Sequence, residues 1–395
     1  SKAKKAYGDV DDPLSPVLAA RADLAAGDPT SALRKLTTAA GLAGEDLAAA
    51  NLVKALALER NKDIGGAGSA LDLAVANAGG NPVPRAARAE FNFRRGKFKD
   101  ALADASASSC ARGLLAKGDA HLALLDLDAA MAAYKSAIAV EPKEPEKAPR
   151  LVGGYVDPFL PPAPDDPGTV ASCRLAQIYF AQERYNEAQE TVEAALGKHP
   201  TEPVALATLA LFALLQEQEG NSDLYLDRAL ELCTKIKKDD AKPYLVSPGT
   251  GYVLWIHGLR RLQQSRLDNA VKALELAPSM DPILRGPCGV LAGRARERQG
   301  TLSKALPKFL EAASAERNES LNLFKGFLAK KHPLPRIEKY FHALLARNPY
   351  HSQARVLRSQ ARLRAGKHLE ALADANAAIK ANPKVREAYL HRAFL

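Results

Sequence analysis

The chain has 395 residues, of which 47% are hydrophobic and 6% aromatic, and its net charge is +10. This composition excludes a collagen-like chain, a disulfide-rich scaffold and a fully disordered chain. Ala, a strong helix former, supplies most of the hydrophobic excess, whereas Val, Ile, Tyr and Phe are too sparse for a large sheet. We therefore expect an all-α protein.

The N-terminal segment and the cysteines indicate a compartment. Residues 1–6 are basic but no apolar run follows them, and the longest uncharged stretch, 203–216, is too short to cross a bilayer. The cysteines form no C-x-x-C motif and no cluster with His at metal-ligand spacing. We expect a cytoplasmic protein, or a periplasmic one if a signal peptide has been removed, with neither a metal nor another cofactor.

A short motif recurs along the chain, in which a Gly precedes an Ala by five residues. Apolar or small residues follow that Ala at the fourth and seventh positions, which places them on one face of a helix. The Gly is typical of a turn between two helices, and a helical hairpin cannot bury its apolar face alone. We therefore expect hairpins that stack in single file. The motif occurs at Gly27/Ala32, Gly96/Ala101, Gly300/Ala305 and Gly366/Ala371, and without its Gly at Ala130, Ala188 and Ala270.

The spacing within one unit resembles the tetratricopeptide repeat family, whose unit has 34 residues. The unit that begins at Thr169 matches the family pattern at Leu175, Ala176, Tyr179, Ala188, Val192, Ala195 and Pro200. The resemblance implies an α-solenoid, a right-handed superhelix of about ten helical hairpins. We expect units near residues 13, 47, 82, 111, 169, 203, 251, 286, 318 and 352, of which the unit near 47 is weak because Gly65-Gly66 stands where Ala belongs.

Two inserts divide the predicted repeats into three groups. Residues 13–142 form the N-terminal repeats, 169–236 the central repeats and 251–395 the basic C-terminal repeats. Pro is dense in the first insert, 143–168, which disfavours a helix there, and the second insert is a loop at 237–250. The first insert is either a domain boundary or, as we favour, a surface loop within one continuous solenoid.

Charge is unevenly distributed among these groups. The net charge is −1 for residues 1–168, −4 for 169–250 and +15 for 251–395. A concentration of positive charge of this size attracts anionic partners. Binding of a polyanion, either nucleic acid or an anionic membrane, is therefore the alternative function. Nucleic acid is disfavoured because the aromatic residues of the basic end fall at core positions of the repeat.

The resemblance also implies a concave groove lined by the first helix of each unit. Carried onto this chain, the groove is apolar in its middle units and basic towards the C-terminus. Exposed apolar surface of this kind marks a binding site for a protein or peptide, here one with an apolar segment and an acidic flank. The candidate binding residues are Cys173, Gln177, Phe180, Ala207, Leu211, Leu214, Trp255, Leu259, Leu262, Arg294, Arg298, Lys330 and Arg364.

Two other interpretations of these apolar positions stay open. The insert carries Leu151, Tyr155 and Phe159, so residues 150–162 could fold back into the groove, either as a structural element or as an autoinhibitory plug. Alternatively, a tight superhelix buries the same side chains between its helices.

No catalytic motif is present. The chain has neither H-E-x-x-H nor G-x-S-x-G, and Gly65-Gly-Ala-Gly-Ser69 lacks the Gly-Lys-Ser/Thr ending of a phosphate-binding loop. We therefore predict a non-catalytic adaptor or scaffold that captures a partner in its groove. Ala-rich and Arg-rich usage suggests a bacterial source, and for a scaffold of this type the resemblance then implies a multiprotein assembly related to the envelope, the pilus or motility, or an effector of a small GTPase.

Overall fold

The computed structural model describes residues 14–25, 27–140, 166–235, 248–280, 284–301, 303–305, 307–308, 334–383 and 385–394. Within these residues all regular secondary structure is helical, as predicted. The two inserts, 143–168 and 237–250, lie almost wholly outside the described residues, as does the first half of the unit expected near residue 318.

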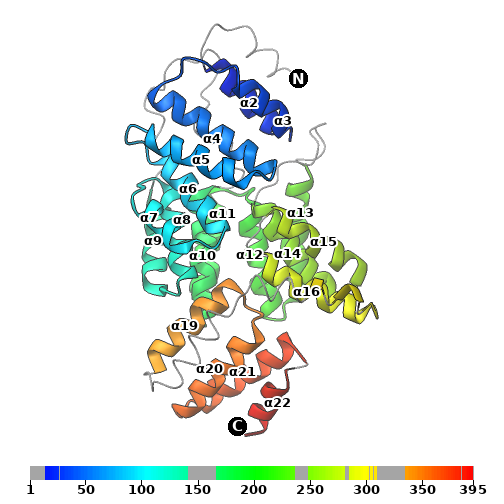
Figure 1. Ribbon diagram of the computed structural model, residues 1–395. Coiled ribbons are helices and arrows are strands. Elements are labelled where there is room, and N and C mark those ends of the chain that lie inside the picture. Colours follow the sequence, from blue (N-terminus) through cyan, green and yellow to red (C-terminus); the bar gives the residue numbers. More distant parts are fainter. Residues whose placement is uncertain are drawn as a thin grey trace.

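Consecutive helices pair as hairpins over the N-terminal part of the chain (Figure 1). Each pair corresponds to one unit predicted from the sequence. The pairs are α2 (Ser15–Ala25) with α3 (Pro29–Leu36), α4 (Gly44–Arg60) with α5 (Ile64–Ala76), α6 (Val83–Arg94) with α7 (Phe98–Ser106), and α8 (Ala111–Ala123) with α9 (Leu127–Ala139).

The central part continues the same arrangement and leads into the C-terminal helices, α19 to α22. These elements confirm the predicted α-solenoid of helical hairpins. The central helices are α10 (Pro167–Ala181) with α11 (Tyr185–Lys198), α12 (Pro203–Leu215) with α13 (Glu219–Lys235), α14 (Pro248–Gln263) with α15 (Leu267–Met280), and α16 (Arg285–Arg298). The C-terminal helices are α19 (Leu334–Arg347), α20 (Ser352–Arg364), α21 (His368–Ala381) and α22 (Arg386–Phe394).

Each hairpin turn among the described residues contains one residue in the left-handed conformation. Gly adopts this conformation freely, whereas any other residue there costs about 1 kcal/mol or more. Gly holds the position, at φ of 72° to 79°, in four turns: Gly27, Gly96, Gly300 and Gly366. Five turns hold another residue, at φ of 59° to 67°: Lys62, Leu125, Glu183, Glu217 and Ser265.

A small buried side chain follows the left-handed residue by five positions in every one of these turns. It allows the second helix to approach the first closely. These residues are at most 1% exposed: Ala32, Ala67, Ala101, Ala130, Ala188, Ser222, Ala270, Ala305 and Ala371. The weak unit near residue 47 therefore folds like the others, with Ala67 in this role rather than Gly66.

The first helix of a hairpin carries matching small residues where the second helix crosses it. A Cβ atom added to Gly118 of α8 would lie 2.4 Å from Cε1 of Tyr134 in α9. A Cβ atom on Gly258 of α14 would lie 2.5 Å from Cγ of Leu274 in α15. Both distances are far below van der Waals contact, so these hairpins pack with a large side chain directly against backbone.

The C-terminal helices return to the middle of the molecule. The largest hydrophobic cluster runs from α8 to α16 and also includes Ala343 and Ala346 of α19. Helix α19 contacts α10, α9 and α8, and Figure 1 shows it beneath α9 and α10. The hairpins therefore do not contact only their neighbours in sequence, as single-file stacking would require.

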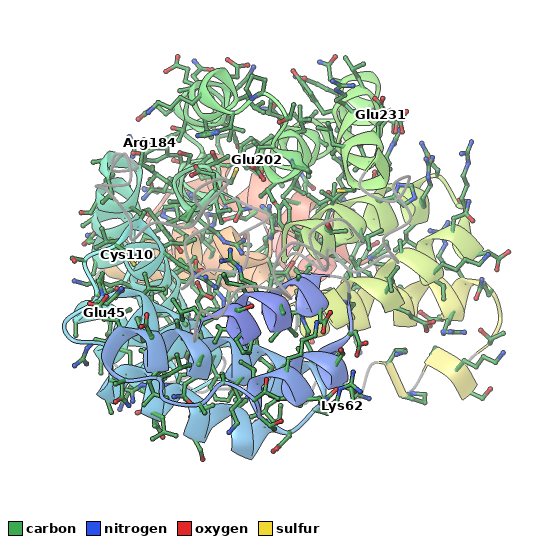
Figure 2. The ribbon with its side chains drawn as sticks, turned by 90° about the horizontal axis from the view of Figure 1, so that it is seen from above. Glu45, Lys62, Cys110, Arg184, Glu202 and Glu231 are labelled. Atoms are coloured by element: carbon green, nitrogen blue, oxygen red, sulfur yellow. The ribbon has the colours of Figure 1, made fainter. Side chains whose placement is uncertain are left out.

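Lys62 provides a test of the turn constraint, because its side chain is exposed and lies at the periphery of the molecule (Figure 2). We predict that Lys62→Gly raises the free energy of unfolding by about 0.5–1 kcal/mol, since relief of the left-handed strain outweighs the entropy that Gly adds to the unfolded chain. Chemical denaturation measures the change. Lys62→Ala is the control, and an equal gain from Ala would contradict the explanation.

Candidate functional site

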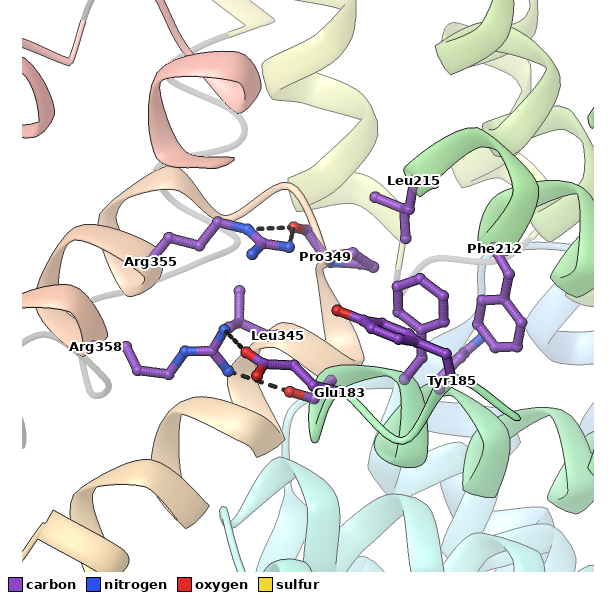
Figure 3. A pocket seen from close by; sticks show the side chains of 11 residues that line it. Glu183, Tyr185, Phe212, Leu215, Leu345, Pro349, Arg355 and Arg358 are labelled. Atoms are coloured by element: carbon purple, nitrogen blue, oxygen red, sulfur yellow. Dashed lines mark hydrogen bonds and ion pairs between the residues drawn. The ribbon is translucent and has the colours of Figure 1, made fainter. Parts of the chain in front are cut away.

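A pocket lies where the C-terminal helices meet the central hairpins. It encloses about 420 Å³, part of which is open to solvent. Figure 3 shows that its walls come from two distant parts of the chain. One wall is formed by residues of α10, α11 and α12, and the other by residues of α19, α20 and the connection between them. We call it the junction pocket; it is lined by Gln177, Phe180, Ala181, Glu183, Tyr185, Phe212, Leu215, Leu345, Pro349, Arg355 and Arg358.

One wall of the junction pocket is aromatic. The rings of Phe180 and Phe212 stack with their centroids 4.5 Å apart. Tyr185 meets Phe180 edge-on at 4.9 Å. Leu215 and Leu345 extend this apolar surface (Figure 3). Such a wall binds an apolar or aromatic side chain.

The opposite side carries two arginines from α20. The Nε and Nη2 groups of Arg355 both donate to the carbonyl oxygen of Pro349, at 3.1 and 3.0 Å. Arg358 donates to both carboxylate oxygens of Asp374, at 2.7 and 2.6 Å. Arg358 also reaches across the junction to the carbonyl oxygen of Ala181, at 3.1 Å, and to Glu183, at 3.4 Å.

Arg362, one helical turn beyond Arg358, completes a buried network of charges. Its guanidinium donates to Glu338 and Glu183, each at 3.0 Å, and to Asp374 at 3.1 Å. The side chains of Arg358 and Arg362 are only 3% and 5% exposed. Buried cations are tolerated only when they are paired, so this arginine network holds α20 and α21 against the α10–α11 turn.

The turn residues of three successive hairpins contact the C-terminal helices. Leu125 packs against the cluster that contains Phe341 of α19. Glu183 pairs with the arginine network, and Glu217 forms an ion pair with Lys380 of α21. These three positions are also among the turns that lack Gly. For Leu125 and Glu183 the sequence carries this signal as a repeat motif without its Gly, at Ala130 and Ala188, whereas the turn at Glu217 was not identified from the sequence.

The structure buries most of the apolar residues proposed for the groove. Their exposed fractions range from 0% to 8%, so they belong to the hydrophobic core rather than to an open surface: Cys173, Ala207, Leu211, Leu214, Trp255, Leu259 and Leu262. This arrangement is the alternative in which the superhelix closes over these side chains. Gln177 and Phe180, which were proposed as binding residues of the apolar middle units, line the junction pocket. The proposed plug, residues 150–162, lies outside the described residues.

Of the basic candidates that the structure describes, two donate hydrogen bonds within the chain and one is exposed. Arg294 donates to the carbonyl oxygen of Ala381, and Arg298 donates to the carbonyl oxygen of Leu262 and the hydroxyl of Ser265, both at 2.9 Å. Arg364 is exposed on α20. Lys330 lies outside the described residues.

In the part of the chain that the structure describes, no helix is both long enough and apolar enough to cross a membrane. Among the same residues, no group of three or more His, Cys, Asp or Glu side chains is arranged to hold a metal ion. None of the four cysteines, all of which the structure describes, forms a disulfide, and Cys173 and Cys288 are buried.

Comparison with known families identifies the repeat. One model of the tetratricopeptide repeat matches residues 17–82, 173–235 and 338–391, and a second model of the same repeat matches residues 111–144. Together these segments cover more than half of the chain. No curated protein sequence matches this one.

Solved structures with a similar arrangement share little sequence with this chain. A tetratricopeptide repeat protein from Parabacteroides merdae is 13% identical, with a TM-score of 0.41, over 76% of this chain and 99% of its own. Human IFIT1, solved as a dimer with m7Gppp-AAAA, is 16% identical, with a TM-score of 0.40, over 97% and 85%. PilF of Pseudomonas aeruginosa is 16% identical, with a TM-score of 0.31, over 57% and 97%. At these scores the likenesses carry no functional argument.

Glu183 offers a test of how the C-terminal helices are held. We predict that Glu183→Gln lowers the free energy of unfolding by about 1–2 kcal/mol, because two buried arginines lose a carboxylate partner. Hydrogen exchange should accelerate in α19, α20 and α21 but not in α4 to α9. Glu217→Gln is the matched control, since it changes the same turn position but breaks only an exposed ion pair, and should leave exchange unchanged. Equal effects of the two variants would contradict the role of the network.

His342 of α19 predicts a pH dependence of stability. Its Nε2 atom is buried without a hydrogen-bond partner among the described residues. Burial, followed by the charges of Arg358, Arg362 and Lys367, lowers its pKa to about 3, whereas an unfolded His titrates near 6.5. The unfolded chain therefore binds this proton first, and stability falls as the pH drops from about 6.5 towards 3.

The variant His342→Leu isolates this contribution. Between pH 7 and pH 5 the wild-type protein should lose about 2 kcal/mol more stability than the variant, as measured by denaturation at each pH. Parallel pH profiles for the two proteins would show that His342 is accessible to protons in the folded state.

Proposed function

Because the chain belongs to the tetratricopeptide repeat family, a family of protein-interaction modules that are generally not catalytic, we propose that it is a scaffold that captures a segment of a partner protein in the junction pocket. The observation that carries the proposal is the combination of an aromatic wall, Phe180 with Phe212 and Tyr185, and the α20 arginines in one partly open cavity.

The size and chemistry of the junction pocket suit a single apolar side chain with a charged neighbour. The space of about 420 Å³ includes open solvent, so the junction pocket has room for no more than one side chain and not for a whole helix. The aromatic wall supplies apolar contact and the arginine side favours negative charge. The partner is therefore a peptide segment with a bulky apolar residue beside an acidic residue, as expected from the sequence.

The location of the proposed site differs from the centre of the predicted groove. Capture at Leu211 or Trp255 would require the core to open, because both side chains are at most 2% exposed. The junction pocket retains Gln177 and Phe180 from the predicted set and adds residues from α12, α19 and α20. The C-terminal helices thus form part of the site instead of a separate basic surface.

The alternative of polyanion binding gains no support from the basic end. A polyanion binds arginines that face solvent, and several candidates are held by partners within the chain. Arg260 pairs with Asp223 at 2.7 Å and Arg296 with Glu275 at 2.5 Å. The proposed setting, a bacterial envelope, pilus or motility assembly or a small-GTPase effector, rests on amino-acid usage and on the type of scaffold, and the cytoplasmic location likewise stays a prediction.

Selection from a displayed peptide library tests the proposal. The full chain is the target, and a Leu215→Gln variant, which places an amide in the apolar wall, is the comparison. We predict that enriched peptides carry a bulky apolar residue next to Asp or Glu, and that synthetic versions bind Leu215→Gln at least about tenfold more weakly by calorimetry.

Leu224→Gln is the matched control, because Leu224 is 68% exposed on α13, outside the junction pocket. This variant should bind like the wild type. Peptides that bind all three proteins equally, or a selection without any common pattern, would argue against capture in the junction pocket.

A further inference from the structure

We infer that Arg355 is the specificity-determining residue of the junction pocket, and that it selects a carboxylate attached next to an aromatic or branched apolar group. This inference rests on the proposed function and names the group that the partner must present. It assigns recognition of the acidic flank to a residue outside the basic set predicted from the sequence.

The charges around the pocket do not balance. Asp374, Glu183 and Glu338 supply three carboxylates to the arginine network. Four cations face them, because Lys367 also pairs with Glu338, at 3.4 Å, and Arg355 adds a further charge. Among the described residues of this network, four cations thus share three carboxylates, and Arg355 has only a long ion pair, at 3.7 Å, with Asp374.

Geometry places that excess charge on Arg355. Both oxygens of Asp374 already accept from Arg358, and the Nη1 atom of Arg355 lies 3.7 Å from Asp374, beyond hydrogen-bond distance. The Oε1 atom of Glu183 accepts from Arg358 and Arg362. The two hydrogen bonds of Arg355 that the structure shows go to a neutral carbonyl group, that of Pro349.

The surroundings of Arg355 make a bound anion favourable. Its side chain is 17% exposed, so a ligand in the pocket can reach it. Burial, followed by the charge of Arg358, lowers its pKa, which means that the folded protein destabilises this cation and that a carboxylate would relieve the cost. In Figure 3 the guanidinium of Arg355 and the aromatic wall lie on opposite sides of the cavity, with the Tyr185 hydroxyl directed towards the arginines. A ligand must therefore carry an apolar group and an anion a short distance apart.

Two small probes separate charge from apolar contact. N-acetyl-L-phenylalanine carries a ring and a carboxylate, whereas N-acetyl-L-phenylalaninamide has nearly the same shape without the charge. We predict that both bind the full chain in the millimolar range and that the acid binds about tenfold more tightly, as followed by saturation-transfer NMR titration at low salt.

Three variants complete the design. Arg355→Gln should remove the preference for the acid while it leaves the affinity for the amide unchanged, and Arg355→Lys should keep part of the preference. Arg364→Gln is the matched control, since it removes the same charge from an exposed position on the same helix and should behave like the wild type. Thermal unfolding verifies that each variant is folded.

The outcomes distinguish the two proposals. If acid and amide bind the wild type equally, Arg355 does not select a carboxylate, although the junction pocket still binds an apolar group. If Arg355→Gln keeps the full preference, the anion is recognised elsewhere and the inference is wrong. If neither probe binds, the junction pocket is not a binding site, and both the inference and the proposed function fail.

Discussion

The architecture depends on one local constraint, a left-handed turn residue followed five positions later by a side chain no larger than Ala or Ser. The turn reverses the chain and the small residue lets the second helix approach the first. In the α8–α9 hairpin this approach places Tyr134 against the bare backbone of Gly118. The two helices of each hairpin are therefore closely packed, and the hairpin buries its remaining apolar face only by stacking on other hairpins. The pocket walls are correctly placed only because α10, α11 and α12 obey the same rule.

Three of the five turn residues other than Gly contact the C-terminal helices. A residue such as Glu183 is strained in the left-handed conformation, and strain of this kind persists where surrounding contacts hold it. Leu125, Glu183 and Glu217 each contact the C-terminal helices, whereas the turns at Gly27 and Gly96 have no such role in the described structure. For Leu125 and Glu183, whose partners are buried, the contacts of the side chain offset the cost of its backbone. These two turns thus form a surface on which α19 and α20 dock, whereas the exposed ion pair of Glu217 adds little.

The sequence predicted the hairpins well because their determinants are local. Gly27 with Ala32 and Gly366 with Ala371 lie within one turn and its following helix, and the structure confirms both. The position of the C-terminal helices depends instead on contacts such as that between Arg358 and Ala181, 177 residues apart, which no repeat pattern encodes. The repeat register shows that Leu211 and Trp255 lie on the helix face that lines the groove, but it does not show how tightly the superhelix closes over that face. The sequence therefore placed both side chains at an open surface, whereas the structure buries them. The junction pocket could not be predicted, because its two walls are brought together by this long-range docking.

The uneven charge of the chain also has a role within the molecule, beside the one expected. A net charge of −4 on residues 169–250 and +15 on residues 251–395 was interpreted as a means to attract an anionic partner. In the structure the two signs meet within the molecule, through Arg260 with Asp223 and Arg362 with Glu183. Complementary charge of this kind favours one docked arrangement of the C-terminal helices over others, since each buried arginine needs its carboxylate. The same docking engages these carboxylates and leaves Arg355 with a neutral carbonyl and a long ion pair to Asp374, so the cation that faces the cavity is a consequence of how the C-terminal helices dock.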